Sequence, residues 1–240
     1  MKKIKIFAIG LLLILFSLPA VAQMKIGIKA GANMNNVRQN FKESSAEINT
    51  RILFAYHAGV LMDYSISDKI SLQPGLFYSR KGFSLDWESE LQGEESFECF
   101  DRTYFDYIEL PVHLAYKFRN IQLYAGPYVS SGIGGKNKMD FSYEMQGNKV
   151  DLKDDFQMRP FLKKEVKESD LKDDESPYYG LDYGINVGVG FTRGQFMINT
   201  GYSNGFGNLV TNTSDFPNDR KDNKLNNTGF NISLTYFFRE

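Results

Sequence analysis

The feature that most constrains the fold of this chain is a two-residue alternation of apolar and polar side chains along most of its length. From Ile108 to Phe118 every second residue is apolar, and Glu109, His113 and Lys117 lie between them. A period of two places successive side chains on opposite faces of a β-strand. The alternation recurs in eight segments: 25–34, 52–64, 70–79, 108–118, 121–130, 181–191, 195–202 and 230–238. We therefore expect an all-β fold of about eight strands.

The connections between these segments alternate between short and long. The short connections are 65–69, 119–120 and 193–194. The long, polar connections are 35–51, 81–102, 136–178 and 205–226. Tight turns at one end and long loops at the other are typical of an antiparallel up-and-down transmembrane β-barrel. We expect three short periplasmic turns, both termini in the periplasm and four long extracellular loops.

Alternation alone leaves open whether the apolar face meets lipid or, as in a soluble lipocalin-like barrel, lines the interior. No charge interrupts the middle of the apolar face, where a Lys or Arg at the bilayer midplane would cost ~2–4 kcal/mol. The polar face is rich in Gly, Ser and Asn, which suit the narrow interior of an eight-stranded barrel. Aromatic residues near the segment ends are typical of interface girdles: Tyr64, Tyr78, Tyr104, Tyr116, Phe118 and Tyr202. The pattern therefore favours a membrane barrel with its apolar face outward.

The first 22 residues are predicted to be a cleaved secretory signal peptide. Three Lys near the N-terminus precede an apolar run over residues 6–18, and Ala20 and Ala22 form a small-x-small cleavage site. The run is shorter than the ~20 apolar residues of a spanning helix, although a retained N-terminal anchor is the alternative. We expect residues 23–240 to form one outer-membrane β-barrel domain.

Charge and cysteine content exclude several classes of protein. Without the three Lys of the predicted signal peptide, the chain has 25 basic and 29 acidic residues, so it carries no basic nucleic-acid footprint. Cys99 is the only cysteine, which rules out an intrachain disulfide and a thiolate metal cluster. Its neighbours Glu98 and Asp101 disfavour a reactive thiolate.

Polar residues on the predicted interior face form the candidate functional site. They are Lys25, Lys29, His57, Asp63, Glu109, His113, Lys117 and Asp182. These residues could form a polar relay or a narrow solute path, but a plug of paired charges filling the lumen is the favoured interpretation. The two histidines could meet across the lumen, although no complete metal-ligand set accompanies them.

We predict no catalytic, cofactor-binding or metal-binding residues. The chain has no Gly-x-Ser-x-Gly nucleophile motif. The glycines of Gly180–Gly190 alternate like a strand and open no helix, unlike a phosphate-binding loop. Calcium is conceivable at the last long loop, but a solvated polar loop is favoured because the spacing does not fit an EF-hand. The oxygen-bearing residues there are Asp215, Asn218, Asp219, Asp222 and Asn223.

The longest connection, 136–178, shows structure of its own. Phe141, Tyr143 and Met145 alternate before Gly147-Asn148, which predicts a hairpin that rises above the membrane. Residues 161–171 could form a short helix.

Several segments resemble the PorT family of outer-membrane β-barrels from Bacteroidota, with an OmpX/OmpA-like small barrel. They are Ile70–Gly82, Tyr107–Val112, Tyr124–Tyr128, Tyr183–Gly188 and Leu234–Phe238. The last segment also resembles the C-terminal signal read by the barrel-assembly machinery, although Arg239-Glu240 follow it. The resemblance implies an outer-membrane address but no agreed activity. The founding member of that family is associated with protein secretion to the cell surface.

The expected function is therefore non-enzymatic: an integral outer-membrane barrel whose surface loops bind partners or contact a neighbouring envelope complex. Expected partners are outer-membrane lipid and lipopolysaccharide, the barrel-assembly machinery during biogenesis, and an extracellular or secretion-complex protein. No nucleic acid and no cofactor are expected. The alternatives are a secretion accessory, a narrow passive pore and, least favoured, a lipid-modifying enzyme.

Overall fold

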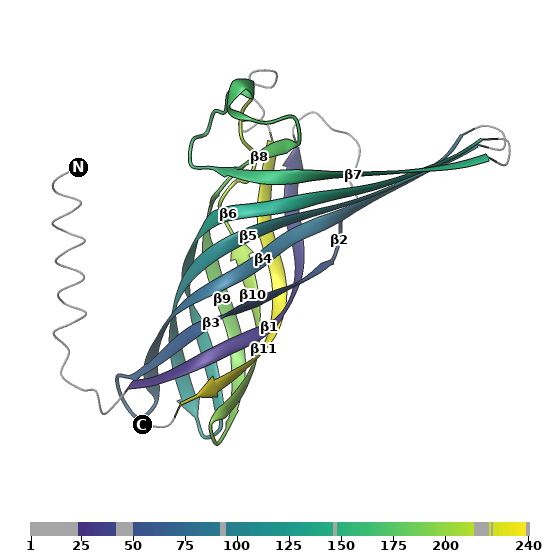
Figure 1. Cartoon of the computed structure of the whole chain (residues 1–240). Helices are drawn as coiled ribbons and strands as arrows, with labels where there is room; N and C mark the ends of the chain where they lie inside the picture. The colour runs from purple at the N-terminus through teal and green to yellow at the C-terminus, as the bar shows by residue number, and fades with distance from the viewer. Residues whose placement is uncertain are drawn as a thin grey trace, which may run out of the picture.

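The computed structural model describes residues 24–41, 50–91, 95–145, 148–213, 221 and 223–238, and most of them lie in β-strands. Eight strands form a closed antiparallel ring, in which β1 pairs with β11 to complete the barrel (Figure 1). They are β1 (Met24–Phe41), β3 (Leu53–Ser65), β4 (Ile70–Leu91), β5 (Glu95–Phe118), β6 (Ile121–Met145), β9 (Leu181–Arg193), β10 (Phe196–Gly205) and β11 (Asn223–Phe237). The predicted all-β up-and-down barrel is confirmed, whereas the predicted signal peptide lies outside the described residues.

The three short connections lie at one end of the barrel, as predicted. They are the bends at 66–69 and two tight turns at Arg119-Asn120 and Gly194-Gln195. Arg119 and Gly194 have φ angles of 54° and 62°, which is the positive φ that a type II′ hairpin turn needs at its first central residue. The sequence placed the last turn one residue too early, because Arg193 still pairs with Phe196 at the end of the ladder.

The extracellular connections are long, but much of their length is strand and not loop. The β4–β5 hairpin continues as far as the pair Leu91↔Glu95, and β6 pairs with β7 (Asn148–Phe161) from Lys136↔Gln157 to Met145↔Asn148. These strands lean away from the barrel axis as one extended sheet (Figure 1). We call this sheet the blade and define it as 84–91, 95–102, 136–145 and 148–157.

The strand boundaries were predicted too short at these places because the solvent-exposed extensions are highly charged. The interior row of β4 nevertheless continues without a break from Ser79 through Lys81, Phe83 and Leu85, all of them buried. The predicted hairpin in the longest connection is confirmed by the β6–β7 pairing, and residues 146–147 of its turn lie outside the described part.

Three small elements complete the described structure. β8 (Glu175–Tyr179) pairs in parallel with the end of β7, and β2 (Thr50–Arg51) pairs with β4. The predicted helix over 161–171 is wrong apart from a single 3-10 turn at Glu168–Asp170, because Phe161 still belongs to β7. Of the conceivable calcium ligands only Asn223, at the start of β11, is described. Among the described residues no helix is long and apolar enough to cross a membrane.

The outer face of the barrel is a continuous apolar band. Its exposed members include Ile28 on β1, Val60 on β3, Leu114 on β5, Val187 on β9 and Leu234 on β11. The alternate residues of the same strands, such as His57, His113 and Asn186, are buried inside. This distribution is what a barrel in lipid requires and confirms the predicted assignment of the two faces.

An aromatic and ionic cluster lies on the outer face where β3, β4 and β5 approach the blade. Arg80 forms an ion pair with Asp106 at 2.7 Å, and its guanidinium lies over the rings of Tyr56 and Tyr104. Tyr78 donates a hydrogen bond to the same carboxylate. Aromatic rings with polar tips suit the membrane–water interface, so this cluster belongs to the extracellular girdle.

Candidate functional site

A buried ionic network occupies the extracellular half of the lumen. The Lys81 ammonium lies 2.7 Å from a Glu109 carboxylate oxygen and 3.3 Å from Asp182. Asp182 is fully buried and also accepts hydrogen bonds from the Tyr128 hydroxyl at 3.2 Å and the Asn227 amide at 3.0 Å. One cation thus holds two carboxylates. Neutral donors bind both of them, because the Ser130 hydroxyl also donates to Glu109 at 3.2 Å.

Lys81 is the residue of this network that the sequence pattern does not reveal, because it falls in the predicted loop 81–102. Its position among the interior-facing residues of β4 could have identified it. Gln73, Phe77, Ser79 and Lys81 occupy alternate positions of one strand and all point to the interior. Two acidic residues face the interior from the strands on either side of β6, Glu109 on β5 and Asp182 on β9, and they also indicate a buried cation.

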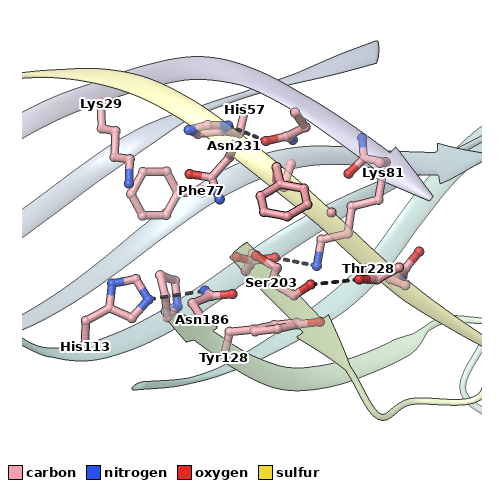
Figure 2. Close-up of a pocket in the computed structure, with 18 of the residues that line it drawn as sticks. Lys29, His57, Phe77, Lys81, His113, Tyr128, Asn186, Ser203, Thr228 and Asn231 are labelled. Atoms are coloured by element: carbon pink, nitrogen blue, oxygen red, sulfur yellow. Dashed lines mark hydrogen bonds and ion pairs between the residues drawn. The ribbon is translucent and has the colours of Figure 1, made fainter. Parts of the chain in front are cut away.

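A cavity of about 60 Å³ lies in the middle of the lumen, with room for only a few water molecules. Figure 2 shows Lys29, His57 and His113 around it. The predicted histidines line the same cavity, but each is held by an asparagine. His57 Nδ1 lies 2.7 Å from Asn33, and His113 Nε2 lies 3.2 Å from Asn186.

Lys29 differs from Lys81 in its surroundings. Its ammonium lies 5.7 Å from the centre of the Phe77 ring and 5.9 Å from that of Tyr124. Cation–π contacts of this kind stabilise a desolvated ammonium. Together Lys29 and Lys81 balance the charges of Glu109 and Asp182, so the upper lumen is close to neutral.

An apolar cluster of Leu61, Phe77, Met197 and Phe237 crosses the lumen below this cavity. Phe77 lines the central cavity, whereas Met197 and Phe237 line a second cavity at the periplasmic end. The cluster therefore separates the two cavities. Packed side chains at this level oppose the passage of solutes.

The periplasmic end of the lumen carries the remaining predicted residues. Lys117 and Asp63 form an ion pair at 2.8 Å, and the Gln73 amide bridges Asp63 and Gln122. Lys25 lines the periplasmic cavity and is exposed. All eight predicted residues therefore face the interior. Ion pairs account for four of them, Asp63, Glu109, Lys117 and Asp182, which supports the plug.

The extracellular mouth is covered by a second apolar cluster. Tyr178 of β8 and Leu209, which follows β10, pack there against residues of the barrel strands. The whole cluster consists of Val37, Phe83, Leu85, Phe105, Tyr107, Tyr178 and Leu209. The Tyr178 hydroxyl also donates a hydrogen bond to the Gly134 carbonyl at 2.8 Å. Burial raises the pKa of this hydroxyl. The mouth is thus closed by folded segments.

Glycines on the interior face accommodate Tyr124. A Cβ atom at Gly201 would collide with the Tyr124 hydroxyl. Gly201→Val is therefore expected to destabilise the barrel by ~1–3 kcal/mol, the usual cost of overpacking, as measured by urea unfolding in lipid vesicles. Gly201→Val should cost less in a Tyr124→Ala background than in the wild-type background, because the overlapping hydroxyl is then absent. Equal stability of Gly201→Val and the wild type would show that the lumen is not packed here.

The two faces of the blade differ in chemistry. One face carries cross-strand ion pairs, including Arg102–Asp140 at 3.1 Å and Lys136–Asp155 at 2.6 Å. The opposite face is largely apolar, and its members include Leu85, Cys99, Met139, Val150 and Leu152. Val150 and Leu152 are both at least half exposed.

Cys99 lies on the apolar face and is only 4% exposed. Burial raises the pKa of its thiol, and the Asp101 carboxylate raises it further. Burial also raises the pKa of Asp101, against the hydrogen bonds that it receives from Asn137 and Thr103. A buried thiol with a raised pKa is a poor nucleophile, as the sequence predicted.

No group of three or more His, Cys, Asp or Glu residues in the described part of the chain is arranged to hold a metal ion. The described histidines are bound to asparagines, and the described lumen carboxylates are bound to lysines. The site therefore consists of a filled lumen below and an exposed blade above.

A closed antiparallel barrel with an apolar outer band and a filled lumen defines a small outer-membrane β-barrel protein. The family described as "Outer membrane protein beta-barrel domain" matches residues 21–211, and the chain belongs to this family. Its location is accordingly the outer membrane.

Three solved structures are among those that are similar to this chain. Ail, the attachment invasion locus protein of Yersinia pestis, is 12% identical, with 90% of this chain and 99% of that chain covered and a TM-score of 0.38. Neisserial surface protein A is 10% identical, with 90% and 98% covered and a TM-score of 0.38. The outer membrane protease OmpT from Escherichia coli is 8% identical, with 92% and 99% covered and a TM-score of 0.33. At these values the likenesses carry no functional argument. No curated protein matches the chain significantly.

Proposed function

We propose that this protein is a non-enzymatic outer-membrane barrel that presents its blade and extracellular loops to a protein partner outside the cell or in a neighbouring envelope complex. The observation that carries the proposal is the blade itself. Four strands continue beyond the apolar band and end in an exposed sheet, while the lumen below them is closed. Recognition usually depends on segments displayed by a rigid scaffold.

Most of the blade can be removed without touching the two apolar clusters of the lumen. We would excise residues 86–100 and 140–153 and close each hairpin with an Asn-Gly turn. The pairs Leu85↔Asp101 and Met139↔Asp154 then become the last paired residues of the two hairpins. The shortened protein is expected to remain a folded barrel, recognised by faster gel migration before heating. It is also expected to lose surface binding, measured by attachment of host or envelope proteins to whole cells.

A matched control keeps the blade length and replaces exposed residues on its charged face, such as Lys138→Gln. This control should retain binding if the apolar face is the contact surface. Full wild-type binding by the shortened protein would remove the basis of the proposal.

The lumen supports a closed barrel and not a passive pore. We expect the refolded protein, from residue 23 onward, to give no steady ionic conductance in planar bilayers, because packed side chains close the lumen at two levels. Reproducible single-channel steps from the wild type would favour the pore.

Narrower roles rest on sequence features. Membership of the PorT family and a secretion-accessory role are supported by motifs such as Tyr124–Tyr128, and we would test them by crosslinking in native membranes. Recovery of no secretion component would count against them. We also propose that the protein is exported with cleavage after Ala22 and inserted by the barrel-assembly machinery. The aromatic and ionic cluster around Arg80 is proposed to contact lipopolysaccharide. N-terminal sequencing of the outer-membrane form tests the cleavage site.

A further inference from the structure

The edge of the blade formed by β7 is open over most of its length. β6 covers one side of β7, but β8 covers the other side only from Gln157 to Phe161. Along Asn148–Phe156 no other strand of the described chain pairs with that side. An open edge presents unpaired backbone N–H and C=O groups and is a template for another strand.

Charges of alternating sign line this edge on one face of the blade. They are Lys149, Asp151, Lys153 and Asp155. Their side chains are 55%, 59%, 80% and 51% exposed, so each can still reach a neighbour across the edge. Edge strands usually avoid association by carrying like charges. The β7 edge instead carries two positive and two negative residues, so a second β7 edge is not repelled.

We propose that the β7 edge pairs with the β7 edge of a second copy of this chain, antiparallel and centred on Leu152. In this register Lys149 lies opposite Asp155 and Asp151 lies opposite Lys153, and each pair occurs twice by symmetry. Leu152 lies opposite its own copy on the apolar face. The interface is thus self-complementary, as a two-fold dimer requires.

Neighbouring registers lose this complementarity. A shift of two residues in one direction places Lys149 opposite Lys153 and Asp151 opposite Asp151. A shift in the other direction places Asp151 opposite Asp155 and Lys153 opposite Lys153. Like charges directly opposite each other are destabilising. A shift of one residue would place the charged face of one blade beside the apolar face of the other.

The membrane permits this symmetry. Two copies in one bilayer have parallel barrel axes, so the two-fold axis that relates them runs along the membrane normal. The paired strands must run across that axis, and the blade does so because it leans away from the barrel (Figure 1). Pairing at the edge leaves the apolar face of the blade free for the partner discussed above, so this inference does not depend on the proposed function.

Cysteine crosslinking tests the register in the full mature protein, refolded in phosphatidylcholine vesicles. Opposed residues of an antiparallel pair have Cα atoms ~4.5–5.5 Å apart, which is within disulfide range. Leu152→Cys is therefore expected to form a disulfide dimer under mild oxidation. Asp151→Cys alone should not form a disulfide dimer, because residue 151 of the second copy lies diagonally across the strand pair at ~7–8 Å. Mixing Asp151→Cys with Lys153→Cys should restore crosslinking, and native Cys99, being buried, serves as the background in the wild type.

Charge variants test the cause of pairing. An acidic edge (Lys149→Asp with Lys153→Asp) and a basic edge (Asp151→Lys with Asp155→Lys) should each lower the dimer fraction ~tenfold or more. A mixture of the two should dimerise again. All these positions are exposed, and gel migration before and after heating confirms folding. Crosslinking of Leu152→Cys no better than that of Asp151→Cys, or no effect of either charge variant, would overturn the proposal. A wild type that stays monomeric in dense vesicles would also overturn it.

Discussion

Replacing Lys81 with methionine is expected to lower the free energy of unfolding by ~3–5 kcal/mol, the usual effect of removing one partner from a buried ionic group. Lys81 is the cation that Glu109 and Asp182 share inside the lumen. Without it, two carboxylates remain close together where water has little access. Urea titration of the protein in lipid vesicles, followed by circular dichroism, measures the loss.

Two controls separate the ionic effect from loss of packing. Lys81→Met combined with Asp182→Asn should recover part of the stability, because one carboxylate is removed and the amide can still bond with Tyr128. Lys136→Met removes a lysine from the exposed pair with Asp155 and should have no measurable effect. If Lys81→Met were no worse than Lys136→Met, the buried network would not stabilise the barrel.

The second large effect is expected on the outer face. Val187 is 45% exposed and lies in the middle of the apolar stretch of β9 between Tyr183 and Phe191. Val187→Arg should destabilise the folded barrel by ~2–4 kcal/mol, because the charge would lie near the bilayer midplane. The same vesicle titration measures this difference.

Val150→Arg is the matched control, since Val150 is 50% exposed but lies on the blade. An arginine there meets water and should leave stability nearly unchanged. Equal effects of the two substitutions would mean that Val187 does not face lipid.

The sequence was sufficient to predict the barrel because membrane strands impose a strict period of two. The interior positions of His57, His113 and Asp182 and the outward position of Val187 follow directly from that parity. The tight turns were predicted from the short connections between alternating segments. That pattern locates a turn only to within about one residue, which explains the error at Gly194.

The ends of the strands and the closures of the lumen were harder to predict. Charged residues such as Asp140, Lys153 and Asp155 suggest a solvent-exposed loop. In the structure they belong to β-strands, where they form cross-strand ion pairs. The apolar clusters combine residues distant in sequence, as Phe77 does with Phe237, and a local pattern does not reveal such contacts. The pairing of Lys81 with Asp182, about a hundred positions apart, was missed for the same reason.

The orientation of the two faces is tested most directly by depth-dependent quenching along β9. Single cysteines at successive positions from 183 to 190 would carry a small fluorophore, and the vesicles would contain lipids brominated in the acyl chain. We expect strong quenching at Tyr183, Ile185, Val187 and Val189, greatest near Val187, and little at the positions between them. Quenching at the intervening positions instead, or at none, would contradict a barrel whose apolar face meets lipid.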